Sequence, residues 1–263
     1  MYLFFFLFFF VFVFFLLFLC ICVFVTNICL YDNKDIIIML LVLFLKFVFF
    51  ILSDYSLFQA DIIFVLDASG SVGADNFEDM KNFTATLVAA MNIGPSNVRI
   101  GLMTYDSLPR IEFNLNDYTT ASEVIATTRA VSYTAGGTAT GLALQTVRTE
   151  MLSLARLNFQ KMIILLTDGI TVDIELMYSE ADAMKAAGVE IVCIGIGYIP
   201  QLATVSSDRK SAYYFEITDF SALNYLARNM IYQVCAGKLT LICVLIIETP
   251  YCSELFFSFN YVN

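Results

Sequence analysis

Five oxygen-bearing side chains, drawn from three separate stretches of the 263-residue chain, have the types and spacing of a metal site. Asp67, Ser69 and Ser71 alternate in the segment Asp-Ala-Ser-Gly-Ser, so a carboxylate and two hydroxyls fall within one tight turn. Thr138 lies in a glycine-rich loop, and Asp168 follows an apolar run in the segment Thr-Asp-Gly. Oxygen donors with only two carboxylates among them suit a hard divalent cation that keeps water or an open position. The pattern therefore predicts a site for Mg²⁺ or Mn²⁺.

The glycine-rich loop, Gly136–Gly141, offers two hydroxyls, because Thr140 stands two residues after Thr138. Thr140 is thus a second candidate for the loop donor, and the glycines let the backbone approach closely. The loop lacks the Gly-Lys-Ser/Thr ending of a phosphate-binding P-loop, which argues against nucleotide hydrolysis. Gly195-Ile196-Gly197 lacks the third glycine and the later acidic residue of a dinucleotide-binding loop, so we interpret it as a tight turn.

The candidate ligands follow predicted strands, whose ends must bring them together. Ile62–Leu66 is a continuous apolar run that leads directly into Asp67. Met162–Leu166 is a second such run, and it ends just before Asp168. Runs of this kind are typical of strands buried on both faces. Four more segments have strand patterns: Val98–Tyr105, Arg110–Leu115, Val189–Ile194 and Tyr213–Ile217.

Segments of helical periodicity separate these strands. The expected helices are Phe77–Met91, Ser122–Ala130, Leu142–Leu154, Ile174–Ala187 and Ser221–Val234. Gly94-Pro95 and Gly188 would end two of them, and Asp173 would cap the fourth. Short apolar strands alternating with helices indicate an α/β fold: a doubly wound, mostly parallel central sheet with helices on both faces, Rossmann-like. Sites in such sheets form beyond the carboxyl ends of the strands.

Four segments resemble a von Willebrand factor type A domain: Asp61–Val72 (DIIFVLDASGSV), Val98–Leu115, Ala135–Leu144 (AGGTATGLAL) and Ile163–Gly169 (IILLTDG). The resemblance covers roughly Ala60–Cys235 in unbroken order and is closest to the extracellular versions in collagens and matrilins. It implies a metal-ion-dependent adhesion site, with all five ligand positions matched: Asp67, Ser69, Ser71, Thr138 and Asp168.

The resemblance also implies how such a site works. Three of its five ligands are neutral hydroxyls, so the cation accepts one more oxygen from a Glu or Asp of a protein partner. The chain is therefore expected to be a divalent-cation-dependent, non-enzymatic adhesion module. We expect it to be extracellular or secreted, or membrane-anchored with the domain outside, in the extracellular matrix or at the cell surface.

Composition excludes several other functions. The chain contains no His, so it cannot use Ser-His-Asp or Cys-His catalysis. A net charge of −10 argues against nucleic-acid binding. No small-molecule substrate is expected. One alternative is an intracellular scaffold with the same fold in a multiprotein complex. The other is a phosphatase-like enzyme with Asp67 as nucleophile, but Ser69 stands where such an enzyme needs a second carboxylate.

The chain is expected to comprise a hydrophobic leader (1–52), the domain (60–236) and a C-terminal tail (237–263). Met1–Val25 has no charge, Gly or Pro and is long enough to cross a bilayer, while Ile36–Leu52 is apolar apart from Lys46. Three interpretations stay open: a membrane anchor of one helix or a hairpin, a secretory signal without the usual basic start, or a misassigned start of the reading frame.

Two side chains outside the metal pattern also suggest modification. Asn82-Phe83-Thr84 is a glycosylation acceptor sequence, and Asn82 projects away from the apolar face of its helix. The resemblance places Cys235 where extracellular members often have a cysteine that bridges the two ends of the domain. Its expected partner before the first strand is missing, so the candidates are Cys29, Cys243 and Cys252, or a free thiol. Cys193 is expected to be buried in a strand.

Overall fold

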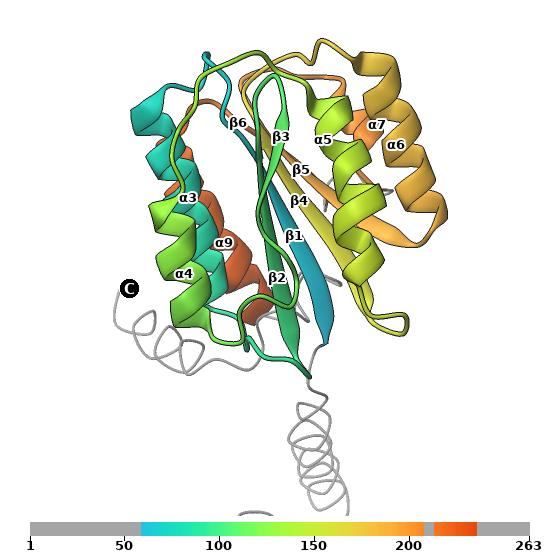
Figure 1. The fold of residues 1–263 in the computed structure, drawn as a ribbon. Coiled ribbons are helices and arrows are strands. Elements are labelled where there is room, and N and C mark those ends of the chain that lie inside the picture. The colour runs from blue at the N-terminus through green and yellow to red at the C-terminus, as the bar shows by residue number, and fades with distance from the viewer. Residues whose placement is uncertain (1–58, 208–212, 236–263) are drawn as a thin grey trace, which may run out of the picture. The chain divides into compact units, whose positions relative to one another are not determined.

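The computed structural model describes residues 59–207 and 213–235, which form a six-stranded sheet between two layers of helices (Figure 1). The strand order is β3-β2-β1-β4-β5-β6, with β3 antiparallel to β2 and every other neighbouring pair parallel. The strands are β1 (Ala60–Asp67), β2 (Val98–Tyr105), β3 (Pro109–Phe113), β4 (Gln160–Thr167), β5 (Val189–Ile196) and β6 (Tyr214–Ile217). The predicted doubly wound α/β fold is confirmed.

Helices cover both faces of this sheet (Figure 1). One face carries α3 (Ala74–Ala89), α4 (Ala121–Ala130) and α9 (Ala222–Cys235). The other carries α5 (Thr140–Thr146), α6 (Ile174–Ala186) and the short α7 (Leu202–Val205). The helix expected over Leu142–Leu154 changes pitch, because α5 is followed by a π-helical turn, Val147–Met151, and a 3₁₀ turn, Leu152–Leu154.

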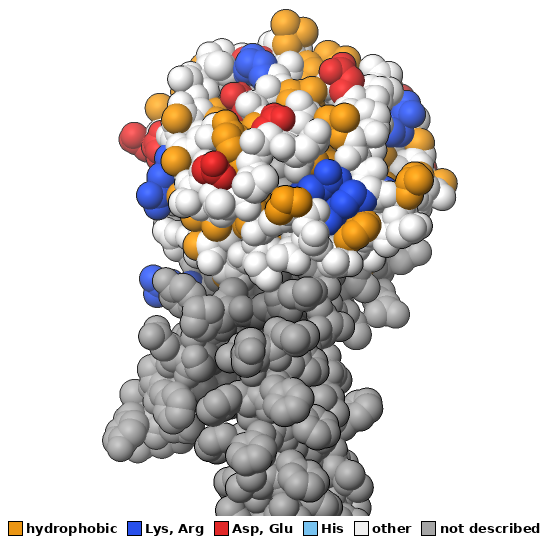
Figure 2. Space-filling model, turned by 60° about the horizontal axis from the view of Figure 1, so that its bottom comes forward, with side chains coloured by type: hydrophobic (Ala, Val, Ile, Leu, Met, Phe, Trp, Pro, Cys, Tyr) orange, Lys and Arg blue, Asp and Glu red, His pale blue; other side chains and the backbone are white. Residues whose placement is uncertain are grey.

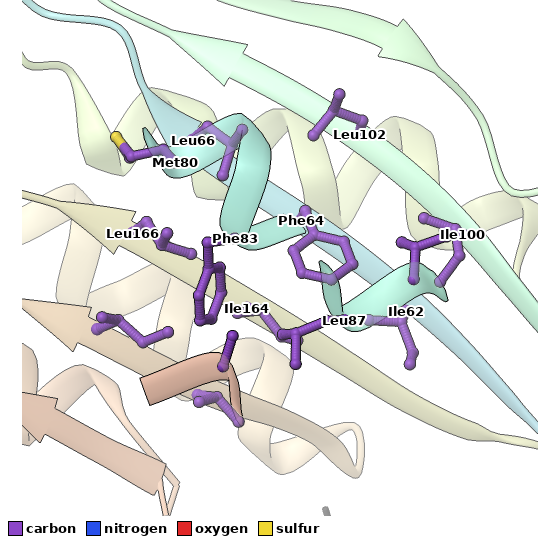
Figure 3. Close-up of a cluster of buried hydrophobic side chains, with 14 of the residues drawn as sticks. Ile62, Phe64, Leu66, Met80, Phe83, Leu87, Ile100, Leu102, Ile164 and Leu166 are labelled. Atoms are coloured by element: carbon purple, nitrogen blue, oxygen red, sulfur yellow. The ribbon is translucent and has the colours of Figure 1, made fainter. Parts of the chain in front are cut away.

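The apolar residues of β1 divide between two hydrophobic clusters, one on each face of the sheet. Ile62, Phe64 and Leu66 belong to the cluster that includes α3 and α9, and Ile63 and Val65 belong to the cluster that includes α5 and α6. All five are fully buried, which explains why the strand reads as an unbroken apolar run. Figure 3 shows the first cluster, in which strand residues meet three side chains of α3: Met80, Phe83 and Leu87.

The strand order fixes where a site can form. β1 and β4 are neighbours at the centre, but β1 leads to α3 on one face and β4 leads to α6 on the other. The two connections diverge, and the carboxyl ends of β1 and β4 therefore flank the crevice in which doubly wound sheets bind ligands. Asp67 and Asp168 stand at these two strand ends.

Two local expectations are wrong. Asp173 lies at the start of α6, but its carboxylate accepts hydrogen bonds from the backbone N–H groups of Gly141 and Leu142, both at 2.8 Å, and so caps α5. Gly195 does not form a turn, because it pairs with neighbouring strands on both sides as part of β5. Gly197, with φ of +84°, is the first residue beyond the strand.

Several expectations fall outside the described residues. They are the leader (1–52), the tail (237–263), and Cys29, Cys243 and Cys252 as partners of Cys235. Among helices of the described residues, none has the length and apolar character that a membrane crossing requires. Cys193 is buried, as expected, and Asn82 is exposed on α3. The use of Asn82 as a glycosylation site stays a prediction.

A buried ion pair fastens the amino-terminal ends of β1 and β2. Asp61 is inaccessible to solvent, and Arg99 donates to both of its carboxylate oxygens, at 2.9 and 2.7 Å. Arg156 donates to Asp61 at 2.9 Å and to the carbonyls of Ala60 and Asn97. Burial alone would raise the pKa of Asp61, but the hydrogen bonds from both arginines hold it below its usual range. Asp61 therefore stays charged in the interior because Arg99 and Arg156 compensate its charge.

Figure 2 views the domain toward this end of the strands. Acidic and basic side chains are both present on this face, among hydrophobic and uncharged polar ones. The face therefore carries charge of mixed sign.

We predict that Asp61→Ala lowers the free energy of unfolding by about 3–5 kcal/mol, because two arginines lose the carboxylate that compensates them. Asp182→Ala is the control, since Asp182 pairs with Lys185 at 3.0 Å while its side chain is 71% exposed. That change should cost less than about 1 kcal/mol. Urea unfolding followed by circular dichroism measures both. Equal losses would show that the buried pair contributes no more than a surface pair.

Candidate metal centre

The Asp67 carboxylate is held by hydrogen bonds from two directions. The backbone N–H of Ser69 donates to Oδ1 at 2.8 Å, and the Thr167 hydroxyl donates to Oδ2 at 2.6 Å. The first contact folds the turn after β1 back onto its own aspartate, and the second ties that aspartate to the end of β4. Asp67 is inaccessible to solvent, so its position is set entirely by these neighbours.

Two serines connect this carboxylate to the second one. Ser69 Oγ and Ser71 Oγ lie 3.1 Å apart, and Ser71 Oγ donates to Asp168 Oδ1 at 2.8 Å. Ser69 is buried, whereas Ser71 is exposed and Asp168 is partly exposed. Hydrogen bonds thus connect the four residues from the buried end of β1 to the surface beyond β4: Asp67 to the Ser69 N–H, and the two serine hydroxyls to each other and to Asp168.

The glycine-rich loop brings Thr138 to the same place. A Cβ atom built on Gly169 would lie 3.5 Å from Thr138 Oγ1 and 3.7 Å from Ser71 Oγ, so both hydroxyls border the residue after Asp168. Thr140 is instead buried, and its hydroxyl donates to that of Tyr105 at 3.2 Å. Of the two candidates for the loop donor, the geometry favours Thr138.

The electrostatics of the cluster suit a cation. Burial raises the pKa of Asp67 above its usual range, and the nearby Asp168 carboxylate raises it further, although hydrogen bonds from Thr167 and Ser69 oppose the shift. Burial also raises the pKa of Asp168, against the hydrogen bond from Ser71. In the described part of the chain, neither aspartate has a Lys or Arg partner.

The donor set therefore fits a hard divalent ion. It consists only of carboxylate and hydroxyl oxygens, which Mg²⁺ and Mn²⁺ prefer. Within residues 59–207 and 213–235 no three His, Cys, Asp or Glu residues gather into a metal-binding group. A site here must accordingly use hydroxyl ligands, as the spacing of the serines and the threonine predicts.

Tyr133 positions the turn after β1, a role that no motif in the sequence predicts. Its hydroxyl donates to the carbonyl of Ser69 at 2.8 Å and accepts from the N–H of Gly73 at 3.1 Å. Its ring packs on Phe77 with centroids 5.7 Å apart. One side chain thus spans the turn that carries the two serines. The only sequence signal is its place just before the glycine-rich loop.

The loop after β4 is fastened to the glycine-rich loop. Thr138 accepts through its carbonyl from the Val172 N–H at 2.9 Å and from the Thr171 hydroxyl at 3.1 Å. Asp173 adds its two hydrogen bonds to the start of α5. Gly141 is required there, because a Cβ atom would lie 2.6 Å from the backbone nitrogen of Met177. Thr138 and Asp168 are therefore held in one rigid arrangement.

Asp106, at the end of β2, braces the other side of the glycine-rich loop. It pairs with Arg110 at 3.0 Å, accepts from the Leu108 N–H at 3.0 Å, and its carbonyl accepts from the N–H of Ala139 at 2.8 Å. Burial on its own would raise the pKa of Asp106, but Arg110 and the Leu108 N–H bring it down to about 2.

Tyr133→Phe tests the positioning role, because it keeps the ring and removes both hydrogen bonds to the turn. We expect about 3- to 10-fold weaker Mn²⁺ binding, the effect of losing about one net hydrogen bond's free energy. Isothermal titration calorimetry measures the affinity. Tyr118→Phe is the matched control, since Tyr118 packs edge-on against Phe113 and lies outside the cluster. Unchanged Mn²⁺ affinity in Tyr133→Phe would show that the Tyr133 hydroxyl does not position the site.

The pKa of Asp106 predicts a pH dependence. A carboxyl with a folded-state pKa of about 2, below its ordinary 3.8, stabilises the fold in its charged form. That stabilisation is complete above about pH 5 and is lost as the pH falls toward about 2. The difference in unfolding free energy between wild type and Asp106→Asn should therefore shrink over this interval. A difference that stays constant would contradict the assigned interaction.

Comparison with known proteins identifies the family. The von Willebrand factor type A domain profile matches residues 61–229. The human collagen alpha-1(XX) chain is 32% identical over 181 residues, 67% of this chain and 14% of the collagen chain. Mouse vitrin is 31% identical over 179 residues, 67% of this chain and 27% of vitrin. The chain thus spans well under a third of either relative.

Solved structures agree with the sequence comparison. Proximal thread matrix protein 1 from the mussel byssus matches with a TM-score of 0.62 and 27% identity, over 72% of this chain and 46% of that one. A second structure of that protein, with zinc in its metal-ion-dependent adhesion site (MIDAS) motif, matches with a TM-score of 0.61 and 30% identity. The match covers 65% of this chain and 44% of that one. Because the profile covers more than half of its length, the chain belongs to the von Willebrand factor type A domain family.

Proposed function

We propose that the domain, residues 60–236, is a divalent-cation-dependent protein-binding module of the extracellular matrix or cell surface. The observation that carries the proposal is the hydrogen-bonded cluster of Asp67, Ser69, Ser71 and Asp168, which brings two carboxylates and two hydroxyls together at the central crevice of the sheet. Thr138 borders the same cluster. These five side chains would hold Mg²⁺ or Mn²⁺.

The charge of the ligand set explains why the site would bind a partner. Asp67 and Asp168 together contribute two negative charges, and the three hydroxyls contribute none. A bound Mg²⁺ or Mn²⁺ would supply a coordination position for a carboxylate oxygen from an Asp or Glu of the partner protein. Ser71 is exposed and Asp168 partly so, which leaves this side of the cluster open to an incoming group. The residues of this chain bind and orient the partner.

The geometry does not favour the phosphatase-like alternative. Both oxygens of Asp67 already accept hydrogen bonds, from Ser69 and Thr167, and the side chain is inaccessible to solvent. A nucleophile must reach its substrate. Ser69 cannot serve as the acid that such an enzyme requires, and the chain has no His to replace it.

The relatives support an extracellular location over an intracellular scaffold. They are two matrix-type proteins by name, a collagen and a byssal thread matrix protein, together with vitrin. Export would also make Asn82 a usable glycosylation site. The Thr84 hydroxyl of the acceptor sequence is buried and donates to the Met80 carbonyl at 3.0 Å, so a glycan would be added before α3 folds.

The ligand assignment predicts that Asp168→Ala and Asp67→Ala each weaken Mg²⁺ and Mn²⁺ binding by on the order of 100-fold or more, because each removes a charged ligand. Calorimetric titration with Mg²⁺, Mn²⁺ and Zn²⁺ tests this and shows which ion binds best. Asp182→Ala, an exposed carboxylate on α6, should titrate as wild type.

Two outcomes would defeat the assignment. Equal heats in wild type and Asp168→Ala would place the cation elsewhere. Loss of the folded circular dichroism spectrum in Asp168→Ala would show that this aspartate is needed for folding, and the loss of cation binding would then not identify it as a ligand.

A further inference from the structure

The loop that carries Asp168 also presents two large aliphatic side chains to solvent. Ile170 is 64% exposed and Val172 is 78% exposed, in the short connection between β4 and α6. Thr171, between them, is buried and donates to the Thr138 carbonyl. Alternate residues of this loop therefore point inward to the glycine-rich loop and outward to water. We call Ile170 and Val172 the apolar rim.

The exposure of the apolar rim does not come from a loosely held loop. The Val172 N–H donates to the Thr138 carbonyl at 2.9 Å, and the Gly169 N–H donates to Thr167 Oγ1 at 3.2 Å. Asp173 fixes the end of the loop to α5. The two aliphatic side chains are thus held beside the cluster before any partner arrives, which reduces the ordering cost of burying them.

The absence of charged side chains from the loop indicates the kind of partner segment it would suit. Residues 169–172 have no charged side chain, so nothing in them favours a second charge next to the partner's carboxylate. Leu108, in the turn between β2 and β3, is also exposed, at 63%, and its N–H is bound by Asp106 beside the glycine-rich loop. Exposed apolar side chains therefore occur in two of the loops at the carboxyl ends of the parallel strands. Adjacent exposed apolar side chains at a polar site are typical of a protein-binding surface.

We propose that the apolar rim selects protein segments in which the metal-binding Asp or Glu is flanked by aliphatic or aromatic residues. This inference rests on the proposed cation-dependent function, since the carboxylate must first be placed at the cluster. Burial of Ile170 and Val172 against the flanking residues then adds affinity in proportion to the apolar area removed from water. The rim determines specificity and has no part in holding the cation.

Two synthetic peptides with the same fluorescent label, Gly-Leu-Glu-Leu-Gly and Gly-Ser-Glu-Ser-Gly, test the proposal on the Mn²⁺-loaded full chain. We expect the Leu peptide to bind about tenfold more tightly by fluorescence anisotropy. In the double variant Ile170→Ser, Val172→Ser this preference should fall to about twofold or less, with Mn²⁺ affinity by calorimetry unchanged. Leu157→Ser is the matched control, because Leu157 is 92% exposed but precedes β4, at the opposite end of that strand.

The outcomes separate the two proposals. Equal affinity for both peptides in wild type, or a preference that survives in the double variant, would overturn the apolar rim and leave the cation-dependent function standing. If Mn²⁺ is bound and neither peptide binds, both proposals fail. Loss of the preference in Leu157→Ser would also overturn the proposal, because it would show that removing an exposed aliphatic side chain far from the cluster has the same effect.

Discussion

The candidate site depends on the meeting of two carboxylates at the centre of the sheet. Asp67 ends β1 and Asp168 follows β4, and these strands are direct neighbours whose connections leave toward opposite faces. Burial and mutual repulsion raise the pKa of Asp67, and no basic side chain in the described residues pairs with either aspartate. The fold thus places negative charge where only hydrogen bonds, or a cation, compensate it.

Most of the polar contacts around the cluster hold loops in place. Tyr133 spans the turn after β1, Asp173 joins the loop after β4 to α5, and Asp106 supports the glycine-rich loop from β2. Tyr133 and Asp173 do so through side chains that bind backbone groups of distant segments, and Asp106 through its backbone carbonyl, which accepts from the Ala139 N–H. Oxygen donors on three separate loops must be fixed in this way, since side chains left free would lose rotamer freedom on binding an ion. The result is a firmly supported site at the carboxyl ends of central strands that are buried on both faces.

The strands, and the place of four of the five candidate ligands, could be predicted from local pattern, because β1 and β4 are buried on both faces and their apolar runs end at Asp67 and Thr167. Spacing alone could not choose between Thr138 and Thr140. That choice depends on Tyr105, which takes up the Thr140 hydroxyl through a tertiary contact. The same reason explains why Asp173 stands at the N-cap position of α6, as its sequence position predicts, while its side chain caps α5. A capping rule considers only neighbours in sequence, and this carboxylate binds backbone groups about thirty residues earlier.

We expect the three loops to coordinate one divalent cation jointly. A crystal structure of the chain grown with Mn²⁺, with anomalous diffraction data collected near the manganese edge, tests it most directly. We expect a single strong peak, coordinated by oxygens at about 2.0–2.3 Å, in which the segments around Ser69, Thr138 and Asp168 each supply a ligand or bind a water that is itself a ligand. A peak bound elsewhere on the domain, with the Ser69–Ser71–Asp168 hydrogen bonds intact, would contradict it.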